Sequence, residues 1–211
     1  MYISRFMIKE PLTATSDLPL PEARRLLNEN HFRHLPVVDG QGQLVGMITD
    51  RDLRSAYPSS VLTESERIAA YERVEKATVA DIMSVDCVGL TPESTLDDAL
   101  LLFDRKGVGA LPVLEDGRVV GIFSSRDLLA AYKELFGVGE KGSVLLGIED
   151  DGQKGLMTRI VTLLEEHAIP FTRLLRIQDI EHGNRIYLRL NTYKIASVVN
   201  LLREAGIRPA L

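Results

Sequence analysis

A ten-residue pattern occurs twice in this chain, and this repeat constrains the fold more than any other feature of the sequence. The first copy reads LVGMITDRDL from Leu44, and the second reads VVGIFSSRDL from Val119. Upstream, an LPVVD stretch is matched by LPVLE, and their prolines, Pro36 and Pro112, lie 76 residues apart. Self-similarity at a fixed period indicates structural units that pack against one another.

Each copy is expected to fold as strand, helix, strand, turn, strand and helix. In the second copy Leu96, Ala99 and Phe103 recur at helical spacing, which predicts one buried helix face. In the first copy two short β-branched stretches flank Gly40 and Gly42, which favours a β-hairpin.

Further strands are expected at 12–15 and 88–91, where LTAT and VGLT match in spacing. One copy of about 60 residues buries too little apolar surface to be stable alone, so the two should share a core. Between them, residues 62–78 predict a helical connector, with Thr63 and Glu66 spaced as a capping box.

Composition excludes several classes of protein. Cys87 is the single cysteine, so no intrachain disulfide can form. The net charge of −5 leaves no basic surface, and a direct nucleic-acid partner is disfavoured. No apolar run reaches the roughly 20 residues of a membrane span, and MYISRFMIKEP lacks the apolar stretch of a signal peptide. A cytoplasmic protein without a membrane partner is therefore expected.

The repeated turn could serve a ligand or only a helix. Thr49 can cap a helix whose N-terminus favours a phosphate, and the two oxygens of Asp52 can accept hydrogen bonds from adjacent ribose hydroxyls. Ser124 and Asp127 repeat this arrangement. The same spacing is also that of an ordinary capping box, which would stabilise the helix start without any ligand.

The doubled LPVVD and LVGMIT-x-x-D-Leu pattern resembles the CBS domain, which works as a tandem pair in a Bateman-type module. The resemblance covers roughly residues 1–137. It implies two clefts between the copies that sense adenosine-containing ligands. The nucleotide-binding residues expected from the motif and the resemblance are Leu12, Thr13, Phe32, Arg33, His34, Met47, Thr49, Arg51, Asp52, Val88, Val108, Gly109, Ala110, Ile122, Ser124, Arg126 and Asp127.

The resemblance also predicts unequal clefts. It places Asp127 opposite residues 32–34 and Asp52 opposite residues 108–110, so that only the first of these clefts receives Arg33 and His34 from across the pair. Arg51 and Arg126 could neutralise a phosphate in either cleft. The Asp127 cleft is therefore expected to bind more tightly.

Residues 143–211 follow a different pattern. Three glycines between 137 and 142 mark a linker, after which strands and amphipathic helices predict a βαββαβ order typical of ferredoxin-like folds. This part resembles an ACT domain, a small regulatory module that often binds amino acids between paired copies. A possible effector site comprises Asp151, Gly155 and Leu156, although Lys154 stands where that family often has proline. A purely structural or dimerising domain is the alternative.

The expected fold is α+β, a tandem CBS pair with a C-terminal ferredoxin-like ACT domain. An order of this kind is similar to the acetoin-utilisation regulatory family. The expected boundaries are CBS repeat 1 at 1–61, a helical connector at 62–78, CBS repeat 2 at 79–137, a linker at 138–142 and the ACT-like domain at 143–211.

The expected function is that of a non-enzymatic regulatory protein. It would bind AMP, ADP or ATP in the CBS clefts and form a homodimer, with dimerisation or a second effector assigned to the ACT-like domain and the regulated target unknown. The chain lacks the common hydrolase, Walker and zinc-protease motifs, and no catalytic cofactor or metal is expected, because His31, His34, His167 and His182 show no ligand spacing beyond the first pair. The alternative is a protein-protein assembly module with empty clefts.

Overall fold

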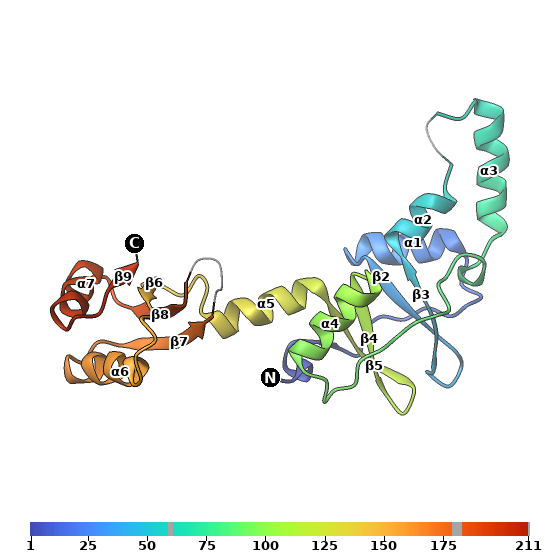
Figure 1. The fold of residues 1–211 in the computed structure, drawn as a ribbon. Coiled ribbons are helices and arrows are strands. Elements are labelled where there is room, and N and C mark those ends of the chain that lie inside the picture. Colours follow the sequence, from blue (N-terminus) through green and yellow to red (C-terminus); the bar gives the residue numbers. More distant parts are fainter. Residues whose placement is uncertain (59–60, 179–182, 211) are drawn as a thin grey trace. The chain divides into compact units, whose positions relative to one another are not determined.

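Residues 1–58, 61–178 and 183–210 are described by a computed structural model. The chain divides into an N-terminal unit, Met1–Ala131, and a C-terminal unit, Tyr132–Leu211. Figure 1 labels the elements of each unit. Within the described residues, no helix is both long and apolar enough to cross a membrane.

The N-terminal unit contains both copies of the repeat. Its elements in chain order are a 3-10 turn at Ile3–Arg5, β1 (Ile8–Lys9), α1 (Leu20–Glu29), β2 (His34–Val38), β3 (Leu44–Thr49), α2 (Asp50–Ala56), α3 (Glu64–Lys76), a 3-10 turn at Val79–Asp81, α4 (Leu96–Lys106), β4 (Ala110–Glu115), β5 (Arg118–Ser124) and α5 (Ser125–Phe136), whose last turn passes into the C-terminal unit.

The two copies have equivalent hairpins. Pro36 pairs with Met47 across β2 and β3, and Pro112 pairs with Ile122 across β4 and β5. Each ladder has a register shift at the same place, between Val37 and Val38 in one copy and at the matching position in the other. The predicted hairpins are confirmed, as are the connector helix and its capping box.

The strands expected at 12–15 and 88–91 do not form, so this prediction is wrong. Each stretch forms only a single parallel bridge, Ala14 to Val37 and Leu90 to Val113. In the first copy, Ala14 makes both bonds of this bridge. Its N–H donates to the carbonyl of Pro36, and its carbonyl accepts a hydrogen bond from the N–H of Val38. The chain then turns toward α1 or α4 before a ladder can extend.

The segments that precede the two copies are exchanged between them. Strand β1 pairs with β5 of the second copy, with Ile8 opposite Ile122, while Ser84 pairs with Met47 of the first copy. Met7 lies against Gly121 and Met83 lies against Gly46, so close that a Cβ at either glycine would be within 2.8 Å of the sulfur. Each copy therefore completes the other, and neither has a full sheet by itself.

Apolar side chains form a core in each copy and a contact between the copies. The first core contains Leu27, Leu35 and Ile48 together with Val79 of the exchanged segment. In the second copy Phe123 is fully buried and stacks on Phe103, with ring centroids 6.2 Å apart. The exchange thus ties the first core to a segment that precedes the second copy.

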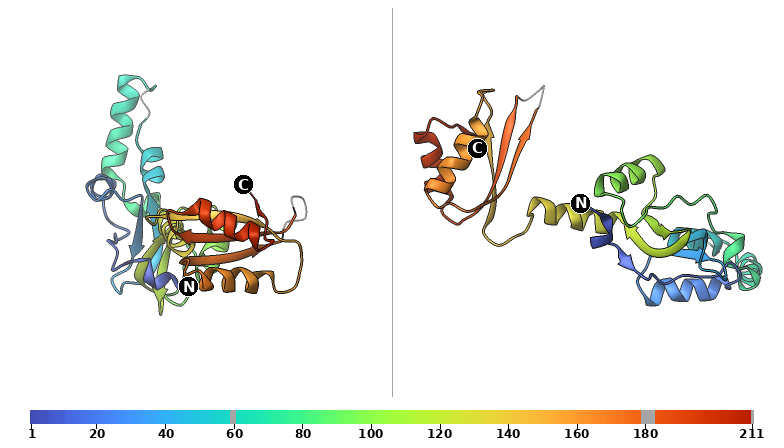
Figure 2. Two further views of the ribbon diagram at one scale, coloured as in Figure 1. Left: turned by 90° about the vertical axis from the view of Figure 1, so that its left-hand side faces the viewer. Right: turned by 90° about the horizontal axis from the view of Figure 1, so that it is seen from below.

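The C-terminal unit has the predicted βαββαβ order. Its elements are the end of α5, then β6 (Ser143–Glu149), α6 (Leu156–Glu166), β7 (Phe171–Ile177), β8 (Arg185–Asn191), α7 (Ile195–Glu204) and β9 (Pro209–Ala210). The sheet order is β7-β8-β6-β9 and every neighbouring pair is antiparallel, which is the ferredoxin-like arrangement. Both helices lie on one side of this sheet (Figures 1 and 2).

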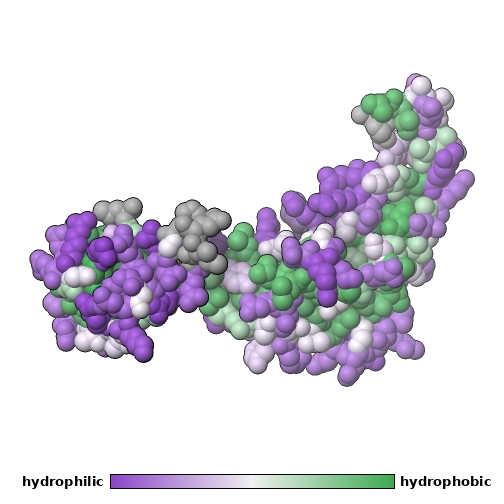
Figure 3. Space-filling view, in the orientation of Figure 1, coloured by the Kyte–Doolittle hydropathy of each residue, from purple (hydrophilic) through white to green (hydrophobic). Residues whose placement is uncertain are grey.

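The predicted alternation of β8 explains why α6 and α7 pack on only one face of this sheet. Ile186, Leu188 and Leu190 are fully buried beneath the helices, whereas Tyr187 and its neighbours on the opposite face are only partly buried. Hydrophilic residues dominate the side of the C-terminal unit that is seen in Figure 3.

Candidate functional site

Both repeated turns begin a helix with a complete capping box. The N–H and the hydroxyl of Thr49 donate to Oδ2 of Asp52 at 2.8 and 2.7 Å. The matching groups of Ser124 donate to Oδ2 of Asp127 at 2.8 and 2.6 Å. In return the N–H of each aspartate donates to the hydroxyl at 3.3 Å. The prediction that Thr49 caps the helix beginning at Asp50 is confirmed.

The second oxygen of each aspartate is free to accept. Oδ1 of Asp52 and Oδ1 of Asp127 have no hydrogen-bond partner among the described residues. Neither oxygen is a buried atom that lacks a partner, so each is open to solvent. Each carboxylate can therefore keep its helix cap and still accept a hydrogen bond from a ligand hydroxyl.

The capping box alone does not identify a binding site in this chain. Among the described residues, boxes with the same exchange of bonds also begin at Thr63 and Thr95, and Thr78 donates to Asp81 in the same way; the bonds of all three are exposed. The boxes of Asp52 and Asp127 differ because they are partly buried and follow a sheet strand directly. Their partial burial is what makes these two carboxylates candidates for ligand recognition.

The backbone holds the entrance to each repeated helix in the same way. The N–H of Asp50 donates to the carbonyl of Arg33 at 3.0 Å, and the N–H of Ser125 donates to the carbonyl of Gly109 at 3.0 Å. The segment before the LPV strand is thus fixed to the helix start of its own copy. A cationic side chain at Arg33 and none at Gly109 is the clearest difference between the two entrances.

His34 lies at the boundary between the copies. A Cβ at Gly109 would be 3.0 Å from both Cε1 and Nε2 of His34, so the imidazole rests against the second copy. Burial lowers the pKa of His34, an effect opposed mainly by Asp50. The other charges that shift this pKa are Arg51, Arg33 and Asp52, all in the first copy. The expected approach of Arg33 and His34 to Asp127 stays a prediction.

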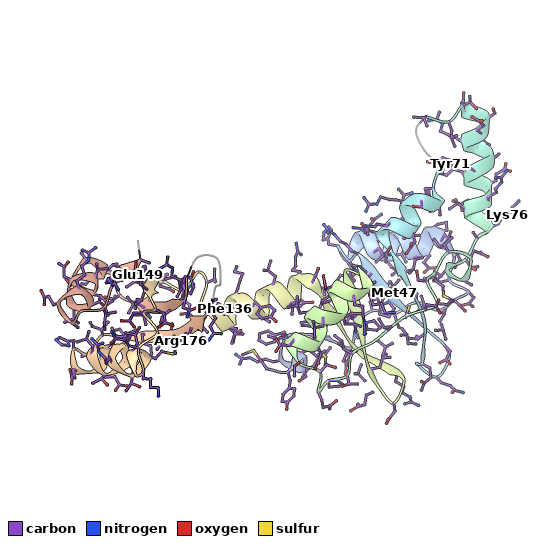
Figure 4. All side chains as sticks on the ribbon, in the orientation of Figure 1. Met47, Tyr71, Lys76, Phe136, Glu149 and Arg176 are labelled. Carbon is purple, nitrogen blue, oxygen red and sulfur yellow. The ribbon has the colours of Figure 1, made fainter. Side chains whose placement is uncertain are left out.

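An apolar cluster joins the two copies beside the turns. Met47, Ala110 and Ile122, all predicted to line the clefts, are buried together, and Figure 4 labels Met47. Cys87 packs against this cluster and donates to the carbonyl of Ser84 at 3.1 Å. Burial, and then Asp86, raises the pKa of its thiol.

Cys87 is the residue that the sequence reasoning missed at this place. Its position immediately before Val88, a predicted cleft residue, was the available signal. A partly buried thiol with a raised pKa is a weak nucleophile, so its contribution at neutral pH is packing.

The remaining predicted cleft residues are more exposed. Phe32 and Val108 occupy equivalent positions and are 39% and 41% exposed. Those that are exposed or only partly buried are Leu12, Thr13, Arg33, Arg51, Val88, Gly109 and Arg126. Their convergence on one ligand stays a prediction.

The three effector residues predicted in the C-terminal unit have different environments. Leu156 is 3% exposed and belongs to the core. Gly155 has a φ of +82° and precedes α6 without a side-chain cap. Asp151 is exposed and accepts a hydrogen bond from the N–H of Gln153 at 3.0 Å. Only Asp151 and Gly155 are therefore placed where a ligand could reach them.

Other hollows and clusters lie away from the repeated turns. One open hollow of about 670 Å³ is lined by Arg24 of α1, the end of α2 and residues that follow α2, and here the guanidinium of Arg24 stacks 4.0 Å above the ring of Tyr57. Among the described residues no group of three His, Cys, Asp or Glu side chains could hold a metal ion. His182 lies outside the described residues.

Comparison with known proteins identifies the repeat. The model of the CBS domain matches residues 3–59 and 79–134, one match for each copy. The chain belongs to the CBS domain family. The two matches lie almost wholly in the N-terminal unit; the second ends at residue 134, three residues past the end of that unit and two residues before the end of α5.

Relatives of this CBS pair include both small proteins and parts of enzymes. A CBS domain-containing protein of Dictyostelium discoideum is 38% identical over 131 residues, which cover 60% of this chain and 88% of that protein. Other relatives, including L-aspartate semialdehyde sulfurtransferase and inosine-5′-monophosphate dehydrogenases, are longer, and the chain spans only 21–33% of their length.

Two solved structures show the same fold over about two thirds of this chain. The CBS domain pair of protein MJ0100, solved with 5′-methylthioadenosine and S-adenosyl-L-methionine, has a TM-score of 0.52, is 28% identical and covers 63% of this chain and 99% of that one. AcuB from Vibrio cholerae has a TM-score of 0.54 at 24% identity and covers 66% of this chain and 96% of that one, which shows the fold alone.

Proposed function

We propose that the CBS pair of this protein binds adenosine-containing ligands and acts as a regulatory sensor without catalytic activity of its own. The observation that carries the proposal is the pair of partly buried carboxylates, Asp52 and Asp127. Each carboxylate keeps one oxygen for its helix cap and presents the other to solvent. Two hydroxyls on neighbouring carbons of a ribose are suitable donors to such a group.

Each part of an adenosine nucleotide has a partner of suitable chemistry. The adenine would pack against the apolar cluster of Met47, Ala110 and Ile122, which lies beside both turns. The phosphate would lie at the N-terminus of a repeated helix, where Arg51 or Arg126 is exposed one residue before the aspartate. We propose that Arg33 and His34 add positive charge to the Asp127 cleft.

The chemistry of a similar CBS pair supports an adenosyl ligand. Protein MJ0100 was solved with two compounds that share an adenosine group and differ in charge. Recognition of adenosine by an aspartate and an apolar slot, with the tail of the ligand left variable, would allow AMP, ADP, ATP or S-adenosylmethionine here.

The second candidate function is an assembly module with empty clefts. It is favoured by the capping boxes, which are complete without any ligand and which recur at the exposed Thr63, Thr78 and Thr95. In that case the repeated turns would only stabilise helices, and the partners would be proteins.

We propose that the C-terminal unit is an ACT-like domain that forms a homodimer or binds a second effector. One face of its ferredoxin-like sheet carries neither α6 nor α7, and β7 is an edge strand whose backbone can pair with another chain. Sedimentation at micromolar concentration tests the dimer, and a mass near that of one chain, 23.4 kDa, would contradict it.

Calorimetric titration of the whole chain with AMP, ATP and S-adenosylmethionine tests the adenosyl proposal. We expect at least one to bind, and the double variant Asp52→Ala/Asp127→Ala to lose that binding. If none of the three binds to the folded wild-type protein, or the double variant binds as well, the assembly function takes the place of the adenosyl proposal.

A further inference from the structure

One helix belongs to both units of the chain. Helix α5 begins at Ser125, directly after the capping residue Ser124, and carries Asp127 in its first turn. It ends at Phe136, labelled in Figure 4, within the C-terminal unit. The part from Ser125 to Ala131 belongs to the N-terminal unit, and the part from Tyr132 onward belongs to the C-terminal unit.

The end of α5 is closed by its own backbone. Gly137 has a φ of +64°, its N–H donates to the carbonyl of Glu134 at 3.1 Å, and the N–H of Val138 donates to the carbonyl of Lys133 at 2.8 Å. This pair of bonds is a Schellman motif, in which a glycine in the left-handed region stops the helix. The helix therefore has a defined last turn that other groups can recognise.

Arg173 on β7 binds that last turn. Its Nη2 donates to the carbonyl of Glu134 at 2.7 Å, its Nε donates to the carbonyl of Leu135 at 2.8 Å, and its Nη1 lies 3.1 Å from Oε1 of Glu140. The side chain is only 25% exposed. A cation bound to the final carbonyls of a helix is in its most favourable place relative to the helix dipole.

A second layer holds the same turn from β8 and β6. Nη1 of Arg189 donates to Oγ of Ser143 at 3.1 Å, and that hydroxyl donates to the carbonyl of Gly137 at 3.1 Å. A Cβ at Gly137 would lie 2.5 Å from Nη1 of Arg173 and 3.1 Å from Cδ of Arg189, so any other residue would displace the Arg173 guanidinium. We call Arg173, Arg189, Ser143 and Glu140 the α5 anchor.

We propose that the α5 anchor couples ligand occupancy at Asp127 to the stability of the C-terminal unit. This inference rests on the proposed function, because it needs a ligand at Asp127. The anchor bonds exist only while the last turn of α5 is formed, and a ligand at the capped start favours the helical state of the same α5. Opening of the anchor and loss of the ligand are then linked events.

Linkage requires the effect to act in both directions. If the ligand raises the equilibrium constant for closing the anchor by some factor, an open anchor must lower the association constant of the ligand by the same factor. The anchor lies outside the predicted clefts, so such weakening would not come from a lost ligand contact.

The test combines calorimetry with hydrogen exchange on the full chain. AMP and S-adenosylmethionine are titrated first, and backbone exchange at residues 137–143 and in β7 is then measured with and without the compound that binds. We expect the ligand to slow exchange at these amides about fivefold or more in the wild-type protein. In Arg173→Gln we expect this protection to disappear and ligand affinity to fall by a similar factor.

Arg176→Gln is the matched control. Arg176 lies on the same strand and pairs with Asp150, with Nη2 2.8 Å from Oδ1, and it makes no bond to α5; Figure 4 labels it. This variant should keep both the affinity and the ligand-dependent protection. Arg173→Lys, which retains the charge but not the fork of donors, serves if the glutamine variant fails to fold, and it should lose part of the protection.

The outcomes separate the two proposals. If neither compound binds, the proposed function fails and the coupling falls with it. If a compound binds without slowing exchange at 137–143, or if Arg173→Gln and Arg176→Gln behave alike, the coupling is wrong while the binding function stands.

Discussion

The two CBS copies share their backbone devices and differ in the side chains around them. Both have a register shift in the hairpin, an exchanged segment, a glycine pressed by a methionine and a helix that begins with a part-buried capping box. Beside the start of the repeated helix, α2 or α5, the first copy has Arg33 and His34 where the second has Gly109 and Ala110. The backbone features that build the fold are thus the same in both copies, and the side chains differ at the positions where a ligand is proposed to bind.

The largest expected effect tests whether the copies are one folding unit. Phe123 and Ile48 occupy equivalent positions, opposite Leu111 and Leu35, and both are fully buried. Phe123→Ala should lower the free energy of unfolding by about 3–5 kcal/mol, and Ile48→Ala by about 2–5 kcal/mol. Because β1 belongs to the second sheet and Val79 to the first core, each variant should shift one common transition.

Urea unfolding followed by hydrogen exchange in both hairpins measures this common transition. As a control, Ile160→Ala in the separate core of the C-terminal unit should leave the CBS transition in place. If Phe123→Ala unfolds the second copy while the β2–β3 hairpin stays protected, the copies are independent and the exchange of segments does not couple them.

The exchange of segments is a feature that local sequence patterns do not predict. The helices, both hairpins and the capping boxes at Thr49, Thr63 and Thr95 follow from local patterns, so they could be predicted. The pairing of Ile8 with Ile122 could not, because it joins residues that are distant in sequence and only two residues of β1 form a ladder. Met7 and Met83 lie 76 residues apart, as do Pro36 and Pro112, and this longer extent of the repeat was the available signal.

For the candidate site, the bonds within each turn were easier to predict than the contacts between the two copies. The bonds of Ser124 and Asp127 follow from their spacing, and the cluster of Met47, Ala110 and Ile122 follows from the repeat. Which residues face one another across a cleft depends on how two sheets pack, which no local pattern specifies. The prediction of a strand at 88–91 is wrong for a related reason. The sequence of four residues does not show whether the segment forms a strand or, as here, only a single bridge.

Removal of each cleft carboxylate should reveal the difference between the copies. Asp127→Ala should weaken adenine-nucleotide binding about tenfold or more, because hydrogen bonds to a charged group contribute about 1.5–3 kcal/mol. Asp52→Ala should weaken it less, because its cleft is predicted to lack Arg33 and His34. Calorimetry of both variants measures the difference.

Asp98→Ala provides the control for loss of a helix cap. Asp98 accepts the same two bonds from Thr95, at 2.8 and 2.7 Å, but it is exposed on α4 outside the clefts. All three variants should lose about 1 kcal/mol of stability from the cap, and only the two cleft variants should lose affinity. If Asp127→Ala binds nucleotide as wild type does, the part-buried box is a cap alone.

Arg33→Ala should have a smaller effect that sharpens the comparison. This change removes the cation that distinguishes one entrance from the other and leaves the bond from the N–H of Asp50 to its carbonyl in place. We expect AMP to bind a few-fold more weakly and adenosine, which has no phosphate, to bind unchanged, since an exposed charge contributes about 0.2–1 kcal/mol. Equal losses for both compounds would show that Arg33 acts on the fold and not on the phosphate.

The smallest expected effect is a dependence of binding on pH through His34. Burial holds the pKa of His34 below its usual value, against the pull of Asp50 and Asp52 and with the help of Arg51 and Arg33. The free protein is therefore less stable as the pH falls from the ordinary histidine pKa toward this lowered one, because the unfolded chain takes up the proton first.

A phosphate near the imidazole would favour its charged form and raise this pKa in the complex. Binding would then take up a proton, and the affinity for AMP should rise as the pH falls through the interval between the two pKa values. His34→Asn should abolish this rise while keeping the titration of the phosphate itself, so the ratio of the two affinities isolates the imidazole. If that ratio is constant between pH 5 and pH 8, His34 does not face the phosphate, and the tighter binding predicted for the Asp127 cleft would rest on Arg33 alone.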